Sequence, residues 1–266
     1  MLLPSNMAAN DSNTASERPA NVSADAAANT ENWAAARAEL QGLVEPMPSA
    51  LRKLLTEEWS NAARFEHASI ASFSRFSLEL MAVGAPPEFL VGAHRAALDE
   101  IRHAELSFAL ASVYAGKALG PAALPMDRVN FGPYELASIV EHTVEEGCVM
   151  ETLAALEAQA ALERAEPKAV QHVLSVVTRD EQAHATLAFR FVAFARARTG
   201  RALDAVIERG FETTMRRVRA ESPMVAPLDE RLAAHGRLTG EERHALRQRA
   251  LVGVLDQARG ALLASS

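Results

Sequence analysis

The sequence predicts an all-α protein, and three features indicate this. Aromatic residues make up only 5% of the chain while alanine is abundant, a composition that favours helices. Apolar residues recur at helical spacing over long stretches, and each stretch ends at glycine or proline. The stretches also come in pairs joined by short turns, as in antiparallel helix pairs. With 266 residues, of which 49% are hydrophobic, the chain can bury a sizeable core.

Composition also narrows the classes of function. A net charge of −7 with interspersed signs argues against nucleic acid as a partner. No apolar run reaches the roughly 18 residues of a membrane span, and the first residues lack a signal peptide's basic start and apolar stretch. We therefore expect a cytoplasmic protein without a membrane partner. The single cysteine, Cys148, excludes an intramolecular disulfide and a four-cysteine metal module.

The first 48 residues form a low-complexity segment rich in Ala, Asn, Ser, Thr and acidic residues. They carry too few large apolar side chains to offset the entropy lost on ordering. We predict that residues 1–48 are a disordered tail that acts as a spacer.

The central part of the chain predicts a bundle of four long helices. Gly84 and Pro86 end the first helix, and Glu166 with Pro167 mark the turn before the fourth. A longer stretch rich in glycine and proline lies between the second and third helices and can cross the end of the bundle. The expected helices are 49–83, 87–115, 134–165 and 167–198, with the crossover at 117–133.

Residues 200–266 predict further helices. One covers about 201–220, and Thr239 with Glu242 form a capping box that opens a last helix. We expect this extension to pack on the bundle or to form a subunit contact, as in a homodimer.

One motif, Asp-Glu-x-x-His, occurs twice within the helical patterns. Its copies are Asp99, Glu100 and His103, and then Asp180, Glu181 and His184. Positions i and i+3 of a helix lie on one face, so each copy presents a carboxylate and an imidazole to the same point. Two such points that face each other would make a site for two metal ions.

The first and third helices each supply a glutamate upstream of a motif. Glu66 precedes Glu100 by 34 positions, and Glu146 precedes Glu181 by 35 (100 − 66 and 181 − 146). The superposition of the two halves therefore favours Glu146 on the third helix, although Glu145 and Glu151 are also candidates. Glu151 lies about 140° further round an α-helix than Glu146, so we expect it to reach the metals only from the side, as an extra ligand.

His142, one turn before Glu146, is a further candidate for an extra ligand. Glutamates among apolar residues are costly to bury as unpaired charges. Two divalent cations would balance four carboxylates, and two neutral imidazoles would complete the ligand set.

This pattern resembles the ferritin-like di-iron carboxylate superfamily, whose bundle supplies a Glu from each of two helices and a Glu-x-x-His from each of the other two. The resemblance covers about residues 50–198. It implies a ferritin-like four-helix bundle with two iron ions, or manganese or a mixed pair. The implied ligand sets are Glu66, Glu100 and His103 for one ion, and Glu146, Glu181 and His184 for the other.

The four glutamates would be the catalytic residues because they hold the reactive metals, with Glu100 and Glu181 bridging. A metal-bound histidine usually donates its second N–H to a carboxylate, so we expect Asp99 and Asp180 to orient the histidine of the opposite motif.

The resemblance implies an oxidoreductase that uses dioxygen or peroxide. The first hypothesis is an oxygenase or oxidase of a small-molecule or carrier-bound substrate, with an electron donor that the sequence does not name. The alternatives are a ferroxidase or rubrerythrin-like peroxidase, and a bundle in which the metals are only structural.

Overall fold

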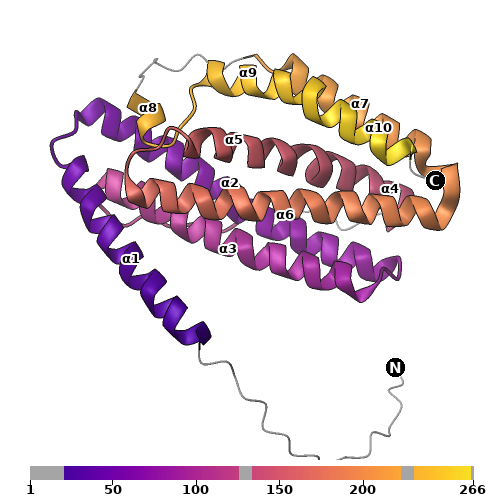
Figure 1. Cartoon of the computed structure of the whole chain (residues 1–266), viewed down its shortest axis with the longest axis horizontal. Helices are drawn as coiled ribbons and strands as arrows, with labels where there is room; N and C mark the ends of the chain where they lie inside the picture. Colours follow the sequence, from indigo (N-terminus) through magenta and orange to yellow (C-terminus); the bar gives the residue numbers. More distant parts are fainter. Residues whose placement is uncertain (1–20, 126–133, 223–230, 265–266) are drawn as a thin grey trace, which may run out of the picture.

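The computed structural model describes residues 21–125, 134–222 and 231–264, with side chains from residue 33 onward. Within this part of the chain the protein is all-α, and long helices pack side by side (Figure 1). None of the helices described there is both long enough and apolar enough to cross a bilayer.

The first predicted helix pair is present. Helix α2 (Ser49–Ala82) and helix α3 (Pro87–Ala115) are joined by a short turn and pack along their lengths. Gly84 adopts a φ of 62° in this turn, a conformation that glycine reaches without strain. The bounds predicted for these two helices, 49–83 and 87–115, are confirmed to within one residue.

The second pair contains a feature that periodicity did not predict. Instead of one α-helix, residues 136–162 form α4 (Leu136–His142), the π-helix η2 (Thr143–Glu151) and α5 (Thr152–Leu162) in direct succession. Helix α6 (Lys168–Thr199) packs against η2, α5 and α3. Of the predicted crossover, residues 117–125 carry no helix and residues 126–133 lie outside the described residues.

The prediction of a disordered tail over residues 1–48 is wrong for its second half. Helix α1 (Asn21–Val44) packs against α3 and α6, and Leu40 and Val44 are buried. Trp33, Ala36, Leu40 and Val44 recur at spacings of three and four residues, so a narrow apolar stripe is enough to dock this helix. Residues 1–20 lie outside the described residues.

The C-terminal helices pack on the side of the bundle formed by α4, η2 and α5 (Figure 1). In order they are η3 (Gly200–Leu203), α7 (Asp204–Ala220), α8 (Arg231–Ala234), α9 (Gly240–Ala250), η4 (Leu251–Leu255) and α10 (Asp256–Ala264). The predicted capping box is confirmed, since the Thr239 hydroxyl accepts from the Glu242 N–H and the Glu242 carboxylate accepts from the Thr239 N–H.

Two apolar clusters fill the interior at different heights along the bundle. One surrounds Val144, Leu153 and Phe191, and the other surrounds Trp59, Tyr114 and Val173. Along α3 and α6 the acidic and histidine residues of the two motifs lie between these clusters, and all of them except Asp99 are buried.

Candidate metal centre

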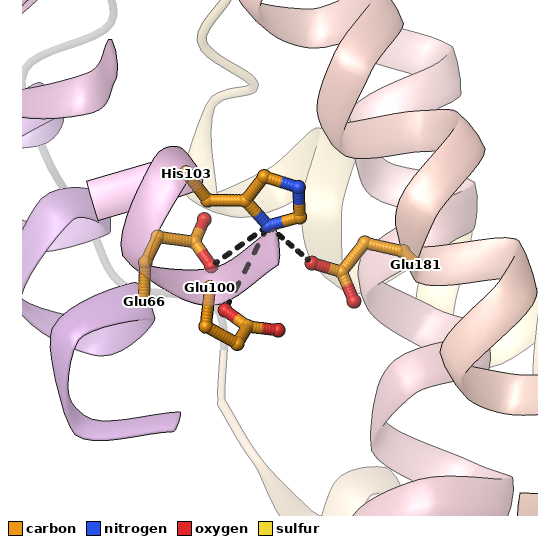
Figure 2. Close-up of side chains that lie close together, drawn as sticks. All are labelled: Glu66, Glu100, His103 and Glu181. Carbon is orange, nitrogen blue, oxygen red and sulfur yellow. Dashed lines mark ion pairs between the residues drawn. The ribbon is translucent and has the colours of Figure 1, made fainter. Parts of the chain in front are cut away.

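The first group of candidate ligands comes from α2, α3 and α6. Glu66, Glu100, His103 and Glu181 each offer an atom within 4.8 Å of the others (Figure 2). His103 Nδ1 lies 3.9 Å from a Glu66 oxygen, 3.7 Å from a Glu100 oxygen and 3.4 Å from a Glu181 oxygen. Ligand atoms bound about 2.1 Å from one ion at angles of 90–110° lie roughly 3.0–3.4 Å apart, so small side-chain shifts would suit a common ion.

The second group brings in the π-helix. Glu100, Glu151, Glu181 and His184 also lie within 4.8 Å of one another. His184 Nδ1 lies 3.2 Å from Glu100, 3.5 Å from Glu181 and 3.8 Å from Glu151.

Glu100 and Glu181 belong to both groups, so the two candidate positions are adjacent. The His103 and His184 rings are 6.0 Å apart between centroids. A carboxylate has two oxygens, so a carboxylate that two neighbouring cation positions share could bridge them.

The hydrogen bonding of the cluster tests whether cations fit it. Buried polar atoms are normally hydrogen-bonded, and each exception calls for an explanation. Four buried atoms in this cluster have no hydrogen-bond partner among the described residues: Glu100 Oε2, His103 Nδ1, Glu181 Oε2 and His184 Nδ1. All four belong to the two groups, so bound cations would satisfy them.

The second nitrogen of each histidine meets an aspartate of the other motif. His103 Nε2 lies 3.2 Å from Asp180, and His184 Nε2 lies 3.4 Å from Asp99. An Nε2–H that donates to aspartate leaves the Nδ1 lone pair facing the glutamates, which is the tautomer that a metal ligand requires. The predicted crosswise pairing of each aspartate with the opposite histidine is present.

The cluster is electrostatically costly without cations. Burial, and then the Glu100 carboxylate, raises the pKa of Glu66 well above its ordinary value. Burial, and then the Glu181 carboxylate, does the same to the pKa of Glu151. Burial alone would lower the pKa of His103, but the Glu100 and Glu181 carboxylates outweigh it and raise that pKa to about 10.

The choice of Glu146 as the ligand from the third helix does not fit the geometry. Its side chain is 45% exposed and forms an ion pair with Arg75, whereas Glu151, expected only as an extra ligand from the side, is in the second group. The cause is η2, because its wider turns, closed by hydrogen bonds between residues five apart, bring Glu146 and Glu151 closer together round the helix axis than the 140° that separates them on an α-helix. Glu146 therefore lies on the same face as Glu151 but one turn away.

His142, the other suggested extra ligand, lies outside both groups; its Nδ1 is 3.7 Å from a Glu79 oxygen. Glu79 and Arg75 are neighbours of the site that sequence reasoning missed. The available signal was the spacing of four residues between Arg75 and Glu79 in a stretch with many apolar residues. In the structure Glu79 is only 4% exposed.

No protein-family model, no curated protein and no solved structure matches the chain. The interpretation of the site therefore depends on its own geometry and chemistry.

Proposed function

We propose that residues 49–199 form a ferritin-like bundle that holds two divalent metal ions, with iron as the native metal. The observation that carries the proposal is the pair of four-residue groups sharing Glu100 and Glu181, with unpartnered atoms directed into both. Glu66 and His103 would complete the first position, and Glu151 and His184 the second. Four carboxylates would balance two divalent cations, and mixed oxygen and imidazole ligands suit iron and manganese.

We further propose that the centre makes the protein an oxidoreductase. Two bound ferrous ions would supply one electron each for the two-electron reduction of dioxygen or peroxide. The protein's part is to hold the Nδ1 atoms of both histidines toward the ions through Asp99 and Asp180, and to exclude bulk water. Phe73 supports the second task because its ring lies edge-on against His184, 4.9 Å between centroids.

Between the two oxidative functions we favour an oxygenase or oxidase of a small molecule. Glu151 and His184 line a cavity of about 40 Å³, and Arg75 is also part of its lining. A site for peroxide or iron alone has no evident need for an arginine there. The alternative of a ferroxidase or peroxidase is favoured by the small size of the cavity, which has room for about three water molecules.

Metal analysis of anaerobically purified protein, followed by exposure to oxygen under optical spectroscopy, tests the proposal. We expect two iron ions per chain and an absorption band of oxidised iron that appears on exposure. A double variant, Glu100→Ala with Glu181→Ala, is expected to lose both ions.

Fewer than one ion per chain in the unaltered protein would overturn the metal centre. A bound metal that is inert to both oxygen and peroxide would support the structural role instead. Rapid peroxide consumption with no dependence on an organic substrate would support the peroxidase.

A further inference from the structure

The cavity beside Glu151 and His184 has a charged end that the metal centre does not use. Its lining includes Arg75, Glu79, His142 and Glu146, contributed by α2, α4 and η2. The ligand end and the charged end belong to one continuous space, so a molecule bound at Arg75 would reach toward the proposed metals.

Arg75 contacts two carboxylates that differ in their exposure to solvent. Its Nε lies 3.3 Å from Glu79, whose side chain is 5% exposed and held inside the bundle. Its terminal NH2 group pairs with Glu146, whose side chain is 45% exposed. Glu79 already balances the charge of Arg75, so Glu146 is the surplus partner and the one that can turn away into solvent.

Two buried nitrogens at this end have no hydrogen-bond partner among the described residues. They are Arg75 Nε and His142 Nδ1, and both lie near the same Glu79 oxygen without forming a hydrogen bond to it, at 3.3 and 3.7 Å. Leaving a buried polar group without a hydrogen-bond partner destabilises the folded state. An oxygen atom of a ligand would relieve this destabilisation.

The walls between the two ends are mainly apolar. They include Phe73 and Phe76 of α2 and Leu187 and Ala188 of α6. The chemistry of the cavity therefore calls for a ligand with an anionic head and a short apolar body. If the head takes the place of the Glu146 carboxylate, only the body has to fit the cavity of about 40 Å³, which limits it to roughly two or three carbon atoms.

We propose that Arg75 and His142 anchor the carboxylate of a small apolar monocarboxylic acid, and that Glu146 occupies this anchor when no ligand is bound. One carboxylate replaces another on the guanidinium, so the charge balance of the cluster is unchanged. Arginine suits this exchange because its planar fork can bind a carboxylate through two parallel hydrogen bonds. The inference names the substrate class of the proposed oxidoreductase and rests on that function only for the fate of the ligand, not for its binding.

Calorimetric titration of the full chain, loaded with redox-inert Zn²⁺, tests the anchor. The probe is propionate, and propionamide is its uncharged counterpart. We expect saturable binding of propionate and at least tenfold weaker binding of propionamide. Arg75→Gln should weaken propionate binding at least tenfold.

Glu146→Gln should tighten propionate binding a few-fold because it weakens the internal competitor. The matched control is Glu145→Gln, which makes the same charge change one residue away, where the carboxylate pairs with Arg217 and does not line the cavity. Glu145→Gln should leave the affinity unchanged. This comparison decides the matter even where Arg75→Gln fails to fold.

Three results would overturn the anchor: no binding of propionate, equal binding of propionate and propionamide, or an equal response to Glu145→Gln and Glu146→Gln. Unchanged affinity in a folded Arg75→Gln variant would show that the acid binds the metals directly, and would also overturn it. Zinc content measured on the same samples separates this failure from failure of the metal centre.

Discussion

The sharpest prediction concerns Glu151, which the structure places in the second ligand group only. Glu151→Gln keeps the size of the side chain but removes its charge, and the first group of Glu66, Glu100, His103 and Glu181 stays intact. We therefore expect the variant to bind one ion tightly instead of two. Replacing a residue that only orients a ligand typically costs 10–100-fold in metal affinity, so losing a ligand charge should weaken the second position by more than 100-fold.

The same change has a calculable effect on stability. An ion present at 100 times its dissociation constant stabilises the folded state by about 2.7 kcal/mol, so two ions contribute about 5 kcal/mol. For a domain of this size each kcal/mol shifts the unfolding midpoint by about 2–4 °C. Loss of one ion should therefore reduce the metal-induced shift by about half, or roughly 5–11 °C.

Without metal the effect should have the opposite sign. Burial raises the pKa of Glu151 above its value in the unfolded chain, so the stability associated with its protonated form is lost as the pH rises toward 7. At pH 7 the carboxyl group therefore opposes folding, and the neutral amide should raise the unfolding midpoint of the metal-free protein.

Thermal unfolding with and without metal, together with metal analysis, measures both effects. Glu146→Gln is the matched control, because it makes the same charge change five residues away and should keep two ions per chain. The reasoning fails if Glu146→Gln loses an ion, or if Glu151→Gln retains both with unchanged affinity.

Three further predictions follow from the same structure. Asp180→Asn should lower metal affinity by about 10–100-fold yet keep two ions per chain at saturation, as measured by metal titration, because it only loosens the orientation of His103. Because the pKa of His103 is raised to about 10, its imidazolium stabilises the metal-free fold fully below about pH 6.5, and this stabilisation is lost as the pH rises toward 10. An incoming ion must also displace the imidazolium proton. Metal titrations at pH 6, 7 and 8 should therefore show affinity rising with pH, and a flat profile would contradict this protonation state. Leu40→Ala should lower the free energy of unfolding by about 2–5 kcal/mol, because Leu40 is buried, whereas Leu43→Ala at an exposed position should lower it by at most about 0.5 kcal/mol. Denaturant unfolding measures both, and equal effects would mean that α1 does not dock on the bundle.

The sequence alone was sufficient to predict the helices that surround the site. Gly84 ends α2 as predicted, and Gly116 follows the last residue of α3, because a positive φ is a local requirement that glycine meets by itself. The sequence alone also predicted that each Asp-Glu-x-x-His motif brings a carboxylate and an imidazole together, since this follows from helical spacing. Their crosswise aspartate pairing also followed, from the chemistry of a histidine that binds metal.

Other features depended on contacts between distant segments. Helix α1 is stabilised because it packs on α3 and α6 and buries Leu40 and Val44. The composition of the segment does not reveal that a surface on α3 and α6 is there to receive it. The pairing of Arg75 with Glu146 joins residues 71 positions apart. Neither can be found from local pattern.

The exchange of Glu146 for Glu151 shows where this boundary lies. The sequence by itself determined that two motif helices and two partner helices would present carboxylates to a common interior point. Which carboxylate of the third segment arrives there was decided by η2, because a π-helical stretch rotates every residue beyond it relative to an α-helix. The π-helical segment packs against α6 and α7. These tertiary contacts cannot be predicted from the spacing of side chains along the chain.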